Sequence, residues 1–263
     1  MIPSGSPVRD TTTSSDGTRL TYTQLGSGPP VVVCHGSFAT SADWVPFATQ
    51  LAETHTVHLY DRRGLGRNSA APTDGAIDAD VEDLAAMVAA AGPHTAVLGH
   101  SHGGGCALAF AARERFTGSL ILYDPRHATA APISRGHLPE LERLVEDREA
   151  AVEFVMTRLA DVPAEAVSAL RGSPLWQSMI DTVHAFPGEL RLVDSLAWRP
   201  GDLDGIAGQV TFLRGEQSPL ADDEVTALQH LLPTMRTIPL PGQGHFAYAT
   251  EPALLADLVR QNL

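Results

Sequence analysis

The sequence predicts a protein of the α/β class, with a mostly parallel, doubly wound sheet and helices on both of its faces. Short apolar runs alternate along the chain with longer segments whose apolar residues recur at helical spacing. The apolar runs are continuous, as at residues 31–34, which is typical of strands buried on both faces of a parallel sheet. A chain of 263 residues is long enough to form one such domain.

Strands are expected where apolar and β-branched residues run together and end at glycine, proline or polar turn residues. These runs are residues 18–25, 31–34, 56–60, 95–98, 119–123, 209–213 and 235–240. The 17 residues before the first run contain no apolar segment of the kind that a signal peptide needs. We expect those residues to form a loose tail.

Helices are expected where apolar residues share one side of a 3.6-residue period. Residues 42–54, for example, place Trp44, Phe47 and Leu51 on one side. Gly92 and Pro93 stop the second helix of the series. The predicted helices outside the central part of the chain are residues 42–54, 78–91, 103–115, 222–232 and 252–263.

The central part of the chain, residues 125–204, breaks the alternation of strand and helix. It has no clear strand and contains several short amphipathic stretches interrupted by proline and glycine. We interpret residues 125–204 as a helical cap inserted over one end of the sheet. Residues 1–124 and 205–263 then form the core.

Composition and charge exclude several functions. The formal net charge of −13 repels phosphate backbones and anionic lipid headgroups, so we expect no nucleic acid partner. No segment approaches the roughly 20 apolar residues of a membrane span, and we expect a cytoplasmic protein without one. Cys34 and Cys106 lack metal-ligand spacing, and we interpret both as small buried hydrophobic residues.

The strongest chemical signal is the segment GHSHG at residues 99–103. It has the form G-x-S-x-G, follows a predicted strand and opens a predicted helix, which is the context of a nucleophile elbow. The tight turn needs small neighbours and presents the Ser101 hydroxyl at the carboxyl end of the sheet. His100 and His102 flank the serine, but no third ligand with suitable spacing is present, so we predict no metal site.

A serine hydroxyl needs a base to become a nucleophile. His245 is the candidate, because it follows the last predicted strand and precedes the last helix in a glycine-rich loop. The oxyanion of an acyl transfer needs backbone N–H donors, and the residue after the nucleophile, His102, supplies one. We assign the second donor to the N–H of Ser37, in the loop after residues 31–34.

These motifs together resemble the α/β-hydrolase superfamily over essentially the whole chain. The resemblance includes the His-Gly loop at residues 35–36, the segment DRRGLGRNS at 61–69, the elbow and the terminal Gly-His-Phe. It implies a cofactor-free acyl-transfer enzyme with the fold described above. We interpret the glycines of residues 61–69 as structural and expect Asp61 and Arg62 to pair locally.

The acidic member of the triad departs from the common pattern. The superfamily usually carries an Asp just past the seventh strand, where this chain has Ser218. Some members, including lactone hydrolases that open the mycotoxin zearalenone, carry it just past the sixth strand. The chain is similar to these, because Asp124 and Pro125 stand there, and we assign the acid to Asp124. Other candidates are Glu216, Asp222 and Asp223.

The cap predicts the nature of the substrate. Its apolar residues form the cap's interior and line a pocket, and we choose Trp176, Met179 and Trp198 as pocket residues. The expected partner is a small hydrophobic carbonyl compound: an ester, lactone or thioester. A lyase, C–C hydrolase or cyclase chemistry, a ligand-binding role with a weakened triad, and a homodimer all stay open.

Overall fold

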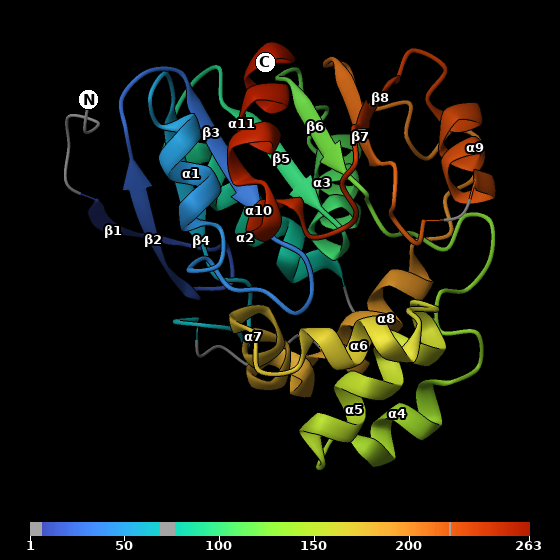
Figure 1. Ribbon diagram of the computed structural model, residues 1–263. Coiled ribbons are helices and arrows are strands. Elements are labelled where there is room, and N and C mark those ends of the chain that lie inside the picture. Colours follow the sequence, from blue (N-terminus) through green and yellow to red (C-terminus); the bar gives the residue numbers. More distant parts are fainter. Residues whose placement is uncertain (1–6, 69–76, 221) are drawn as a thin grey trace.

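The computed structural model describes residues 7–68, 77–220 and 222–263, which form an eight-stranded sheet with helices on both faces (Figure 1). The strand order is β1-β2-β4-β3-β5-β6-β7-β8. Neighbours from β4 to β8 are parallel, whereas β2 is antiparallel to both β1 and β4. The strands are β1 Val8–Thr13, β2 Arg19–Leu25, β3 Pro30–Cys34, β4 Thr56–Tyr60, β5 Ala96–His100, β6 Leu120–Tyr123, β7 Val210–Gly215 and β8 Arg236–Leu240. The predicted mostly parallel, doubly wound sheet is confirmed.

Apolar side chains cover both faces of the sheet, as continuous apolar strands require. In β3, Val31 and Val33 pack into one core, and Val32 and Cys34 pack into the other. Helices α1, α10 and α11 bury the first core, and α2, α3 and α9 bury the second. These helices are α1 Val45–Leu51, α2 Ile77–Ala91, α3 His102–Arg113, α9 Asp222–Leu231, α10 Ala247–Thr250 and α11 Pro252–Gln261.

The N-terminal segment differs from the sequence prediction. β1 pairs with β2 along its whole length, from Val8 opposite Gln24 to Thr13 opposite Arg19. The predicted loose tail is therefore wrong for residues 8–13, and residues 1–6 lie outside the described part of the chain. Backbone hydrogen bonds hold such an edge strand without apolar side chains, and its β-branched residues favour the extended conformation.

Five α-helices lie between β6 and β7 and form a layer beneath the sheet in Figure 1. Their apolar residues form a third buried cluster, separate from the two cores of the sheet. Trp198 and Leu203, near the end of the insertion, pack instead in the sheet core that α2, α3 and α9 bury. The cap elements are α4 Leu138–Leu144, α5 Arg148–Phe154, the π-helix η1 Val155–Leu159, α6 Ala164–Leu170, α7 Pro174–Thr182, the 3-10 helix η2 Val183–Ala185 and α8 Phe186–Ser195.

Helix α3 packs very closely against the end of β3. A methyl group at Gly103 would lie 2.1 Å from the carbonyl oxygen of Cys34 and 2.5 Å from that of His35. Only glycine permits this approach, which brings the start of α3 beside the loop that follows β3. No helix in the described ranges is long and apolar enough to cross a membrane.

Candidate active site

Ser101 stands at the junction of β5 and α3 in a strained backbone conformation. Its φ is 53° and its ψ is −121°, values that side-chain-bearing residues seldom adopt. Neighbouring segments hold this turn: the Ser101 N–H donates to the carbonyl of Tyr123 over 3.0 Å, and the N–H of Arg126 donates to the Ser101 carbonyl over 2.9 Å. This sharp turn has the geometry of a nucleophile elbow, and Ser101 lines a pocket.

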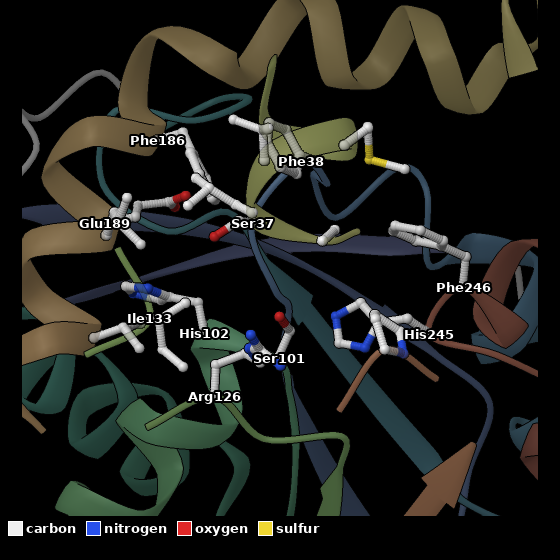
Figure 2. A pocket seen from close by; sticks show the side chains of 17 residues that line it. Ser37, Phe38, Ser101, His102, Arg126, Ile133, Phe186, Glu189, His245 and Phe246 are labelled. Atoms are coloured by element: carbon white, nitrogen blue, oxygen red, sulfur yellow. The ribbon is translucent and has the colours of Figure 1, made fainter. Parts of the chain in front are cut away.

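His245 lies on the other side of Ser101 from Ser37 and His102 (Figure 2), and Asp124 lies beside its ring. His245 Nδ1 lies 3.2 Å from Asp124 Oδ2, and His245 lines the same pocket as Ser101. Asp124 is fully buried, and its other oxygen accepts a hydrogen bond of 3.0 Å from the Gly215 N–H. A buried carboxylate in this position can hold one imidazole tautomer and stabilise an imidazolium.

The other candidate acids have different partners. Glu216 accepts a hydrogen bond of 2.8 Å from the Gly242 N–H. Asp222 pairs with Arg214 at the surface, and Asp223 accepts from the N–H of the next residue. Among the described contacts of His245, Asp124 is thus the carboxylate within reach of its ring.

Ser37 and His102 line the pocket beside Ser101, as the oxyanion-hole prediction requires of them. Residues 35–38 form the loop that carries Ser37, which we call the oxyanion loop. It rests directly on the elbow, because a methyl group at Gly36 would lie 2.8 Å from the Ser101 Cβ and 2.7 Å from His100 Nδ1. This contact places the backbone of the loop against the nucleophile, where an oxyanion would form.

Two residues to which the sequence analysis gave no such role hold the His245 loop. His100 Nε2 lies 2.9 Å from the backbone carbonyl of His245, and the two rings stand 4.7 Å apart. The Tyr123 hydroxyl donates to the Gly244 carbonyl and accepts from the Ala247 N–H. Their positions at the ends of β5 and β6, beside the predicted site, were the available signal.

The pocket is a cavity between the elbow and the cap. Its walls are mainly apolar, and Arg126 and Glu189 add the charged groups. Arg126 immediately follows the Asp-Pro turn and forms an ion pair of 3.4 Å with Glu224. The apolar lining consists of Phe38, Ile133, Val155, Met156, Leu159, Ala160, Phe186, Leu190, Val193, Pro219 and Phe246.

The predicted pocket residues Trp176, Met179 and Trp198 require correction, because none of them is among the residues that line this cavity. Trp176 and Met179 are buried in the cap's own core, and Trp198 packs against the sheet core that α2, α3 and α9 bury. The inner face of α7 fills the cap interior, whereas η1 and α8 face the nucleophile. Amphipathic spacing identifies a buried face but not the element against which that face packs.

The loop after β4 carries two charges with different partners. Asp61 pairs within its loop by accepting from the N–H of Arg67 over 2.9 Å, and it also accepts from the N–H of Ser41, 20 positions away, over 2.6 Å. The prediction of local pairing is wrong for Arg62, which is buried and forms an ion pair with Glu189 on α8. A contact across 127 positions has no signature in sequence spacing. Ser69, the last residue of the predicted loop, lies outside the described residues.

Three buried side chains that could bind a metal ion lie close together near the elbow. The ligand atoms of Asp80, His102 and Cys106 all lie within 4.8 Å of one another. Burial raises the pKa of Asp80 to about 6, although the positive charge of Arg62 opposes that shift. Because this guanidinium already supplies positive charge to the cluster, we assign no metal to it.

The fold and the geometry of Ser101, His245 and Asp124 define the class of α/β hydrolases. A family model described as "Alpha/beta hydrolase family" matches residues 31–258, and the chain belongs to that family.

Individual relatives support this assignment. The chain is 30% identical to an alpha/beta hydrolase from Sphaerobacter thermophilus, with a TM-score of 0.84, covering 96% of this chain and 99% of that one. It is 23% identical to a 2-(acetamidomethylene)succinate hydrolase from Mesorhizobium japonicum over 89% of this chain and 88% of the relative. A non-heme haloperoxidase from Rhodococcus erythropolis is 38% identical over 38% of either chain, so the match spans less than half of that relative.

An esterase from Thermogutta terrifontis shares the fold, with a TM-score of 0.74 and 23% identity over 98% of this chain and 97% of the other.

Proposed function

We propose that this protein is a serine hydrolase that cleaves an ester, lactone or thioester bond of a medium-sized hydrophobic substrate through an acyl-enzyme on Ser101. One observation carries the proposal: a serine on a strained elbow shares a pocket with His245, whose ring is backed by the buried Asp124 at 3.2 Å. This is the constellation that activates a serine hydroxyl.

The residues then act in sequence. His245 takes the Ser101 proton as the hydroxyl oxygen attacks the substrate carbonyl, and the Ser37 and His102 N–H groups stabilise the oxyanion. The imidazolium, stabilised by Asp124, gives its proton to the leaving oxygen or sulfur as that bond breaks. Water, deprotonated by His245, attacks the acyl-enzyme, and the proton returns to Ser101 as the acid product leaves.

The pocket supports the substrate class. Its mainly apolar walls suit a medium-sized apolar acyl or alkyl group. Relatives are named as esterases and as a hydrolase, which agrees with acyl transfer to water. An apolar pocket also explains why we expect short polar esters to bind more weakly than esters with a longer hydrocarbon chain.

The proposal is tested by intact-mass analysis after treatment with a fluorophosphonate probe, followed by turnover of p-nitrophenyl esters of increasing chain length. We expect one adduct on the wild type, none on Ser101→Ala, and much slower labelling of His245→Ala and Asp124→Asn. No adduct on a wild type that also lacks ester turnover would overturn the proposal. Ligand binding or non-hydrolytic chemistry would then have to be considered.

A further inference from the structure

The cap contributes one buried acidic side chain to the pocket, Glu189 on α8. Its side chain is 9% exposed and forms an ion pair with Arg62, which is 3% exposed. Burial alone would raise the pKa of Glu189, but the charge of Arg62, with smaller effects of His102 and Ser37, lowers it to about 2. Glu189 is therefore ionised at neutral pH.

Such a pair contributes little net stability, because removing two charges from water costs about as much as their attraction returns. A pair of this kind is better explained by the geometry that it imposes. The guanidinium of Arg62 also binds the backbone of the loop after β3. Its Nε donates to the His35 carbonyl over 2.9 Å, and its terminal nitrogen donates to the Gly36 carbonyl over 3.1 Å. Arg62 thus binds the cap and the oxyanion loop at the same time.

Glu189 lies next to both residues assigned to the oxyanion hole. Its carboxylate is close enough to the Ser37 hydroxyl for that group to lower its pKa, and its backbone is close to the ring of His102. In Figure 2, Glu189, Ser37 and His102 stand together on one side of Ser101, opposite His245. Through Glu189, the cap therefore borders both residues assigned to the oxyanion hole in the same cavity.

We propose that Glu189, held by Arg62, is a positioning residue through which helix α8 of the cap orients the two oxyanion-hole amides. The inference rests on the serine-hydrolase function proposed above. Oxyanion donors act only when they are aimed at the position of the developing charge, so loss of this contact weakens transition-state stabilisation more than substrate binding. The oxyanion hole is then assembled only when α8 is docked in its place.

The test compares p-nitrophenyl acetate with its thiono analogue, O-p-nitrophenyl thionoacetate. Sulfur accepts hydrogen bonds poorly, so the ratio of kcat/KM for ester over thionoester reports the oxyanion hole. For Glu189→Gln we expect kcat for the oxygen ester to fall about 10–100-fold, since removal of a whole donor costs about 10²–10³. KM should stay within about threefold, and the ratio should fall towards that of an enzyme without the hole.

Two further variants sharpen the test. Glu142→Gln removes a different ion pair to α8, that of Glu142 with Arg191, which lies outside the pocket. This variant should leave kcat and KM for both substrates unchanged. Arg62→Lys keeps the charge but loses the planar fork that reaches both carbonyls, and should reproduce the selective loss if Glu189→Gln does not fold.

The outcomes separate the two proposals. Wild-type rates in Glu189→Gln, or an equal loss on both substrates, would overturn the positioning role while Ser101-dependent labelling leaves the hydrolase function standing. A wild type that neither labels nor turns over either ester would overturn both.

Discussion

At the scale of single residues, two members of the site have strained backbone conformations. Ser101 and Asp124 both have positive φ, 53° and 42°. Conformations of this kind cost about 1–3 kcal/mol each and persist only where the surroundings impose them. Each is held by its neighbours: the Ser101 N–H by the Tyr123 carbonyl, and the Asp124 N–H by the Leu213 carbonyl over 3.1 Å. The sheet thus stabilises the geometry that the proposed chemistry needs.

At the same scale, Asp124→Asn should lower kcat by about 10⁴ with little change in KM. An amide carries no charge to stabilise the imidazolium and can hold His245 in the wrong tautomer. Steady-state kinetics on p-nitrophenyl esters measure both constants. Glu216→Gln is the matched control, because Glu216 binds the Gly242 N–H instead of His245. If the control lost activity and Asp124→Asn kept it, the acid would be misassigned.

At the scale of elements, the packing of α3 on β3 sets the distance between elbow and oxyanion loop. Glycines at both contact points make this possible: Gly103 of α3 meets the carbonyls at the end of β3, and Gly36 of the loop meets Ser101. The first contact is made by backbone carbonyls and the second by the side chains of the elbow, so the position of the site depends on a close approach that only glycine allows. The same reasoning explains why small residues fill the start of α3.

Gly103→Ala should therefore both destabilise the fold and impair the site. The new methyl group would lie 2.1 Å from the Cys34 carbonyl oxygen, so α3 or the loop must move, at a cost of about 1–3 kcal/mol for overpacking. Gly188→Ala is the matched control, because a methyl group there meets nothing within 4 Å, and helix propensity favours alanine. Thermal unfolding of both variants measures the difference, and equal melting temperatures would contradict the argument.

At the scale of the whole molecule, two sheet cores and a cap core enclose several histidines. Burial, with the charge of Arg62 second, lowers the pKa of His35 to about 4 and that of His102 to about 3. For His127, burial and then Arg126 lower the pKa to about 4. Below about pH 6.5 the unfolded chain binds protons on these rings that the folded state does not bind. The free energy of unfolding is therefore at its full value above about pH 6.5 and declines below it.

We expect the free energy of unfolding to fall as the pH drops from about 6.5 to 4. His127 alone should account for about 3 kcal/mol of that loss, since one pKa unit corresponds to about 1.4 kcal/mol. Urea unfolding at several pH values should show a shallower decline for His127→Gln. The exposed His230 serves as the control, and His230→Gln should follow the wild type. Identical slopes for wild type and His127→Gln would contradict the linkage.

Local patterns were sufficient for the class of fold and the order of strands and helices, and they identified the elbow at Ser101. These features depend on residues close together in sequence, whose spacing reflects the geometry of one element. Spacing also placed Asp124 and His245 at strand ends on the same edge of the sheet. β1 was missed because an edge strand is held by its backbone and has no buried apolar face.

What spacing does not encode is which long-range neighbour each buried face meets. Asp124 and His245 are 121 positions apart, and Arg62 and Glu189 are 127 apart. Trp176 carries the pattern of a pocket residue yet lies in the cap core. Helical periodicity defines a face but leaves open the rotation and docking of each helix, which depend on the close packing of all the others. The pocket walls and the link from the cap to the oxyanion loop therefore appear only in the folded chain.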